Sequence, residues 1–307
     1  MKKYAFFAAA ALMLAACSNE DVTTVPDGEV ALKVNATISG TVTRASGTTW
    51  ADNDQIGIST VGTTTQTSYA NIPYTWNGSS FDSDGTDIYF QNLDEVTFSA
   101  YYPFTGTAGT AAGTISVSTD ASNQTTANQP KIDFLYTSGA TADKEHPTVD
   151  FVGNHAFNHC MTQITIEFKE GSDVDFDSGL LTGYTLSSMV MSGSFDTANG
   201  TATAADEETE DLTISLSNVS TTNGTYSTSV IVFPQEDVTS IPLTVTVNKQ
   251  TYKATLTVPA YNSVTGLQAG VNYRFPVTVS KTGLTVGKAD IKDWTTVSDD
   301  SGNTALM

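Results

Sequence analysis

Short runs of alternating apolar and polar residues, separated by clusters of Gly, Asn, Asp and Ser, recur along the whole chain. Successive side chains of a strand point to opposite faces, so a period of two marks strands that are buried on one face. The clearest run has five apolar residues in alternate positions: Val30, Leu32, Val34, Ala36 and Ile38. Residues 243–258 predict a hairpin with its turn at 248–251. Long helical patterns are nearly absent, so the sequence predicts an all-β protein of the sandwich type.

The first residues have the order of a secretory signal peptide. Lys2 and Lys3 precede an apolar core that is shorter than the roughly 20 residues needed to span a bilayer. Residues 14–17, Leu-Ala-Ala-Cys, resemble the bacterial lipobox. That resemblance implies cleavage before Cys17, lipid on its side chain, and a mature chain tethered to a membrane. An ordinary signal peptide followed by a chance cysteine is the alternative.

Length and composition give the domain plan. The 307 residues favour two domains of about 100–150 residues each. We predict a signal peptide over 1–16, a flexible tether over 17–28, a first β-sandwich over 29–154 and a second over 155–307, which ends in a polar tail.

Charge and cysteine content exclude several classes of protein. The net charge is −20, with 33 acidic residues against 13 basic ones, which excludes nucleic acid as a partner because phosphate needs cations. If Cys17 carries lipid, Cys160 has no partner within the chain, so a disulfide framework is excluded. Cys160 itself is predicted to be a buried small hydrophobe.

Motifs for catalysis or cofactor binding are missing from the sequence. His155 and His159 are four residues apart, a spacing that separates them by about 13 Å in a strand. Residues 82–87 resemble part of a calcium loop, but Leu93 stands where an EF-hand needs its bidentate acid, so a plain turn is predicted. No nucleophile elbow, phosphate loop or dinucleotide fingerprint occurs. The sequence therefore predicts no enzyme, no cofactor and no metal site.

Arg44 stands out by its position. It is one of two arginines, the other being Arg274, and it lies between the strand of residues 30–42 and a loop of small residues at 45–49. Exposed loops of small residues are preferred sites of proteolytic cleavage. The alternative is an edge-strand charge that prevents aggregation.

A series of short motifs spans nearly the whole chain. After the lipobox at Cys17 they follow in order at residues 43–47, 50, 54–58, 98–103, 133–136, 157–159, 164–166, 270–273 and 291–294. Together they resemble the fimbrillin family, the pilin subunits of type V pili on Gram-negative bacterial surfaces. The resemblance implies two tandem transthyretin-like β-sandwiches. It also implies export to the outer membrane as a lipoprotein and a cut between Arg44 and Ala45 by an arginine-specific protease.

The resemblance further implies strand exchange between subunits. The cut would release the first strand, within 29–44, and a strand from another pilin subunit would replace it. In the family the donor comes from the C-terminal region, here within 284–307, and its apolar members would be Leu284, Val286, Ile291 and Trp294. Residues 295–307 are too polar to make a good donor strand by periodicity.

Two functions follow as expectations. The first is a structural and adhesive subunit of a surface pilus, which contacts other pilin subunits and a receptor on a host or bacterial surface. Its place as shaft, tip or anchor stays open. The alternative is a monomeric surface lipoprotein that binds glycan or a host protein through exposed aromatics such as Trp50 and Trp76.

Overall fold

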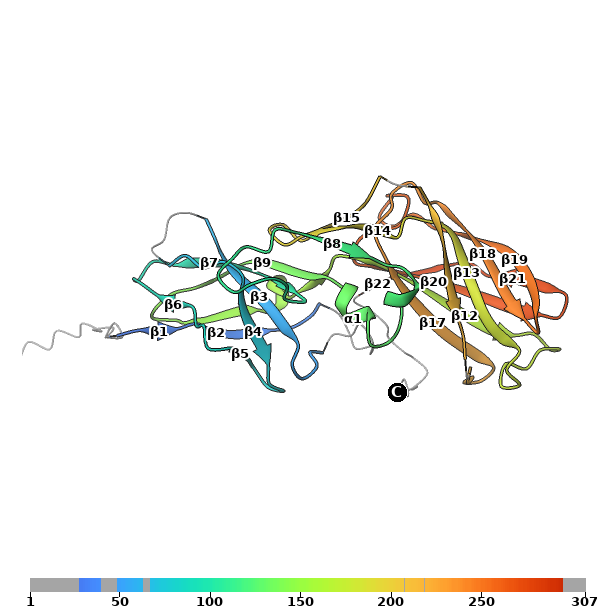
Figure 1. The fold of residues 1–307 in the computed structure, drawn as a ribbon, viewed down its shortest axis with the longest axis horizontal. Coiled ribbons are helices and arrows are strands. Elements are labelled where there is room, and N and C mark those ends of the chain that lie inside the picture. Colours follow the sequence, from blue (N-terminus) through green and yellow to red (C-terminus); the bar gives the residue numbers. More distant parts are fainter. Residues whose placement is uncertain (1–27, 40–48, 63–66, 207, 218, 295–307) are drawn as a thin grey trace, which may run out of the picture.

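The computed structural model describes residues 28–39, 49–62, 67–206, 208–217 and 219–294. It is strand-rich and elongated, with one group of strands at each end of the long axis (Figure 1). The predicted all-β fold is confirmed. The helical segments that the structure describes are short: η1 (Ala121–Asn123), α1 (Gln129–Ile132) and η2 (Gly153–His155). None of these described helices is long and apolar enough to cross a membrane.

The largest sheet occupies the N-terminal end of the molecule. Its strands lie in the order β10 (Thr148–Phe151), β2 (Lys33–Ala36), β5 (Phe81–Ser83), β4 (Ile72–Trp76), β3 (Gln55–Val61), β7 (Val96–Tyr102), β9 (Leu135–Ala142) and β11 (Asn158–His159). A smaller sheet pairs β1 (Val30–Ala31) with β6 (Tyr89–Phe90). Apolar side chains from both sheets form one buried cluster, which includes Ile56, Phe98 and Phe151.

Two further sheets enclose a second buried cluster at the C-terminal end. One has the order β17 (Thr225–Val232), β12 (Thr162–Glu170), β20 (Val271–Ser280) and β21 (Gly283–Val286), with β22 (Asp290–Asp293) also on β20. The other has the order β16 (Glu210–Ser215), β13 (Leu181–Met189), β18 (Ser240–Val247) and β19 (Gln250–Thr257). The first buried cluster ends at Phe157 and the second begins at Ile164. The domain bounds 29–154 and 155–307 stay predictions.

The two halves share buried contacts. The antiparallel sheet of β8 (Thr114–Ser118), β14 (Ser192–Asp196) and β15 (Thr201–Ala204) joins a strand from the first half to a hairpin from the second. Beneath it lies a third buried cluster, here called the junction cluster: Tyr101, Ile132, Phe134, Cys160, Met161, Phe195, Ile231, Phe233 and Trp294. Phe134 stacks on Phe195 across the junction, with ring centroids 4.4 Å apart.

Two glutamine side chains from the first half bind the free edge of β17. Gln124 Nε2 donates to the carbonyl of Ile231 (2.8 Å), and Gln124 Oε1 accepts from the amide of the same residue (2.9 Å). Gln129 Nε2 donates to the carbonyl of Ser229 (2.7 Å). A side-chain amide carries the same donor and acceptor as a peptide group, so these two residues take the place of a neighbouring strand.

Gln124→Ala is expected to lower the free energy of unfolding by about 1–3 kcal/mol, because it leaves a backbone N–H and C=O of β17 without partners. Urea denaturation followed by circular dichroism measures the change. The matched control is Gln91→Ala, which removes a single exposed hydrogen bond and is expected to cost less than about 0.5 kcal/mol. Equal losses in the two variants would contradict a role for Gln124 in joining the halves.

Candidate assembly site

Residues 30–38, here called the N-terminal ribbon, alternate between buried and exposed side chains. Leu32, Val34, Ala36 and Ile38 are each at most 9% exposed, and Val30 packs partly buried against the same cluster. Lys33, Asn35 and Thr37 between them are exposed. The alternation that the sequence predicts is therefore confirmed. The removal of the ribbon during maturation stays a prediction.

On one flank the ribbon pairs in parallel with β10. The amide of Lys33 donates to the carbonyl of Pro147 (2.7 Å), and the amide of Thr37 donates to the carbonyl of Phe151 (2.9 Å). The pairing continues past the strand, where the amide of Ser39 donates to the carbonyl of Phe157 (2.7 Å). This flank is thus hydrogen-bonded from Lys33 to Ser39.

On the other flank the ribbon pairs with antiparallel partners. Val30 and Ala31 lie opposite β6, and the amide of Leu32 donates to the carbonyl of Ile88 (2.8 Å). Val34 lies opposite Phe81 of β5. The ribbon, the blue strands β1 and β2 of Figure 1, therefore fills a slot between two walls. Taking it out would leave unpaired N–H and C=O groups in both walls above an apolar floor.

Trp50 closes the slot beside Ala36. Its indole Nε1 donates to the carbonyl of Ala36 (3.0 Å). Its ring meets those of Phe81, Tyr102 and Phe157 edge-to-face, with centroids 5.0, 5.6 and 5.2 Å away. The expectation that Trp50 and Trp76 are exposed aromatics is wrong, because both are half-buried and Trp76 packs against Phe81 (5.1 Å).

Asp54 fixes the turn that carries Trp50. Its carboxylate accepts from the amide of Ala51 (2.7 Å) and from the hydroxyl of Tyr102 (3.0 Å). Burial raises the pKa of Asp54, and these two hydrogen bonds oppose that rise. Burial and the nearby Asp54 carboxylate raise the pKa of Tyr102, which keeps its phenol protonated as the donor. The Trp50 turn is thus held by groups that lie outside the ribbon.

Three of the four apolar residues of the predicted donor region lie on strands of the second half, and the fourth lies at the junction between the halves. Leu284 and Val286 belong to β21 and Ile291 to β22, and both strands pair antiparallel with β20. Trp294 is 5% exposed in the junction cluster, and its ring stacks on that of His159 with centroids 4.2 Å apart. In the described structure β21 and β22 therefore pair with β20 and not with the ribbon. Their role as donor stays a prediction.

The titratable groups singled out in the sequence have structural partners. His159 Nδ1 lies 2.8 Å from Asp133 Oδ1 in a buried pair, and His155 Nδ1 lies 3.0 Å from the carbonyl of Ser138. The described residues contain no group of three or more His, Cys, Asp or Glu side chains that could hold a metal. Cys160 is buried, which raises the pKa of its thiol. Cys17, Arg44 and Ala45 lie outside the described residues.

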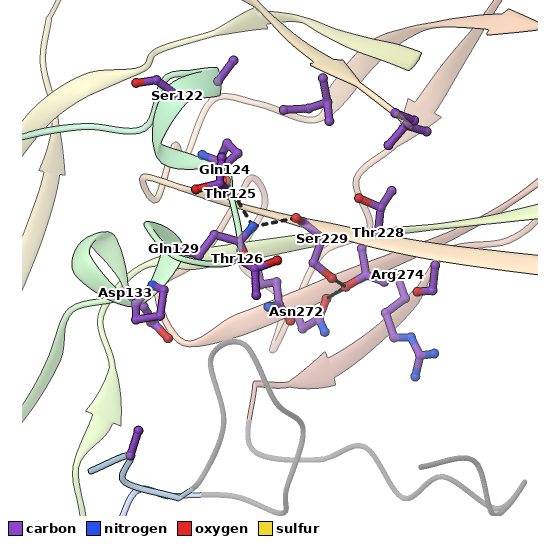
Figure 2. Close-up of a pocket in the computed structure, with 18 of the residues that line it drawn as sticks. Ser122, Gln124, Thr125, Thr126, Gln129, Asp133, Thr228, Ser229, Asn272 and Arg274 are labelled. Atoms are coloured by element: carbon purple, nitrogen blue, oxygen red, sulfur yellow. Dashed lines mark hydrogen bonds between the residues drawn. The ribbon is translucent and has the colours of Figure 1, made fainter. Parts of the chain in front are cut away.

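A groove of about 1620 Å³ lies between the two halves. Its lining is mostly hydroxyl and amide side chains, and Figure 2 shows Gln129 reaching across it to Ser229. Thr165 contacts Ser229 and Asn272 in its wall, and Arg274 is ion-paired with Glu167. Ile38 and Thr49 both line it.

Comparison with known proteins identifies the family. Residues 43–294 match the profile of the fimbrillin-like family. The chain belongs to this family, whose members are structural proteins of the cell surface and not enzymes.

Two solved structures are similar over most of the chain. One is a candidate cell adhesion protein from Bacteroides ovatus, 29% identical, which covers 89% of this chain and 100% of its own with a TM-score of 0.73. The other is a candidate cell adhesion protein from Bacteroides uniformis, 25% identical, with coverages of 88% and 100% and a TM-score of 0.66. No curated protein sequence matches the chain significantly.

Leu32→Ala is expected to lower the free energy of unfolding by about 2–5 kcal/mol, because it removes a buried side chain of the ribbon that packs on the floor of the slot. Lys33→Ala, one position along on the exposed face, is expected to cost less than about 0.5 kcal/mol. Chemical denaturation of both variants measures the difference. Similar losses would mean that the register of the ribbon described above is incorrect.

Proposed function

We propose that this protein is a structural and adhesive subunit of a bacterial surface pilus that assembles by strand exchange. It is exported as an outer-membrane lipoprotein precursor with lipid on Cys17. An arginine-specific protease cuts between Arg44 and Ala45. A strand of another pilin subunit then takes the place of the N-terminal ribbon.

The observation that carries this proposal is the way the ribbon is attached. Its backbone is paired on both flanks and its apolar side chains are buried. Its one covalent link to the fold that follows passes through the segment that contains Arg44. A cut there leaves the ribbon held by non-covalent contacts alone. An extended strand with the same alternation can then add to both walls by backbone pairing.

The geometry of such an exchange favours a fibre. A slot in one half and a donor from the C-terminal end of the chain form a head-to-tail contact that does not close on itself. Leu284, Val286, Ile291 and Trp294 would belong to this donor or precede it directly. β21 and β22 are paired with β20, so donation by either strand requires it to leave that edge.

The choice of cleavage site follows from the arginine content. Arg274 is the other arginine of the chain, and it lies within β20 between β12 and β22 with its guanidinium on Glu167. Proteases bind their substrates in extended, unpaired form, which a strand paired on both sides does not offer. An arginine-specific protease is therefore expected to cut the folded protein at Arg44 alone.

A disulfide across the ribbon tests the exchange. Asn35 and Asp150 are register partners with exposed side chains that share a hydrogen bond of 2.8 Å, so Asn35→Cys with Asp150→Cys suits a cystine. In a chain that also carries Cys17→Ala, the oxidised variant is expected to be cut at Arg44 yet to stay monomeric. Reduction should restore concentration-dependent polymers, which light scattering measures.

The matched control places the cystine in the β18–β19 hairpin, at the partner residues Thr246 and Thr251, where it should not affect assembly. Polymers of the oxidised Asn35–Asp150 variant would contradict exchange of the ribbon. The alternative, a monomeric binding lipoprotein, would be favoured if the wild-type chain stays monomeric with or without reductant. This holds whether the protease cuts the chain at Arg44 or the chain resists cutting.

A further inference from the structure

We propose that Trp50 binds the incoming strand by a hydrogen bond from its indole N–H. We propose further that the site selects a strand with a small residue at the position that replaces Ala36, beside this indole. This inference rests on the proposed strand exchange and identifies the chemistry of the partner strand. The partner is an extended segment of another subunit that is apolar at alternate positions and carries Ala, Gly or Ser at this register.

Trp50 stays with the body of the protein when the ribbon leaves. It follows Arg44 in the sequence, so a cut after Arg44 keeps it in the mature chain. Its indole N–H, which now donates to the carbonyl of Ala36 at 3.0 Å, would lose that acceptor. A backbone carbonyl of an incoming strand at the same register restores the hydrogen bond. The side chain of that residue plays no part in this bond, so any strand in register satisfies it.

The ring contacts of the indole come from residues outside the ribbon. The three rings that contact it, Phe81, Tyr102 and Phe157, are buried and come from other segments of the chain. Asp54 bonds both the amide of Ala51, next to Trp50, and the hydroxyl of Tyr102. The donor is therefore preorganised for the next strand, which reduces the ordering that binding requires.

The aromatic residues around Trp50 also explain why the side chain at position 36 has to be small. Ala36 is the smallest member of the apolar row of the ribbon, and its register partner in β10 is Phe151, which is fully buried. Phe151 meets Phe157 edge-to-face at 5.7 Å, and Phe157 in turn meets Trp50. Phe151 and Trp50 are thus the aromatic neighbours of position 36. A larger side chain there has to displace one of them, and overpacking of this kind is destabilising.

The test uses the full chain cut at Arg44 with its ribbon retained. A fluorescently labelled synthetic peptide of residues 29–40 exchanges with the ribbon, and anisotropy gives its dissociation rate. Trp50→Phe keeps a six-membered aromatic ring and removes the pyrrole ring with its N–H donor, so the peptide should dissociate about 3- to 10-fold faster, as expected for one neutral hydrogen bond. Trp76→Phe is the matched control, because Trp76 is also half-buried and packs on Phe81, which lies outside the ribbon. This variant should change the dissociation rate less than 2-fold, which is the smallest change expected from the loss of one neutral hydrogen bond.

A second arm leaves the protein unchanged and varies the peptide. A peptide with Ala36→Leu should bind at least about 10-fold more weakly than the native peptide. The same substitution at the exposed position, Lys33→Leu, should bind like the native peptide. This arm is independent of how well the Trp50 variant folds.

The outcomes separate the two levels of the proposal. Equal rates for the Trp50 and Trp76 variants, or equal binding of the Ala36→Leu and Lys33→Leu peptides, would overturn the role of Trp50 and leave strand exchange standing. Failure of the native peptide to exchange with the wild-type chain would overturn strand exchange and this inference together.

Discussion

The backbone pairing of the N-terminal ribbon on both flanks is the constraint on which the account depends. β10 and Phe157 bind one side, and Ile88 and β6 bind the other, while the apolar row between them covers the first buried cluster. A strand in this position cannot leave without exposing polar backbone in both walls and apolar side chains beneath. If the ribbon is removed as proposed, the slot therefore needs a replacement strand.

The junction between the halves restricts how the C-terminal region could donate a strand. Trp294 belongs to the junction cluster and stacks on His159, whose other partner is Asp133. A donor strand that included Trp294 would have to withdraw it from contacts that both halves share. Gln124 and Gln129 hold the same junction from the other side by binding the edge of β17. In the proposed assembly, donation of a strand that includes Trp294 would therefore disturb the contact between the halves.

Much of the fold follows from local pattern. The alternation in the ribbon predicts its buried face, and the hairpin of β18 and β19 turns at Asn248 and Lys249, where both residues have the positive φ of a type I′ turn. Contacts between residues that are remote in sequence do not follow from local pattern. The apolar positions of β8 predict no pairing with β14, and the polar residues Gln124 and Gln129 give no signal for binding β17. The sequence wrongly predicts an exposed Trp50 for the same reason, because the rings that bury it come from three separate segments.

The most direct test of the central claim is mass spectrometry of the protein recovered from assembled surface fibres. If another subunit fills the slot, the fibre contains chains that begin at Ala45 and no peptide from residues 30–38. Fibres whose subunits all retain residues 30–38 would contradict strand exchange, since the slot would then never have been open to another chain.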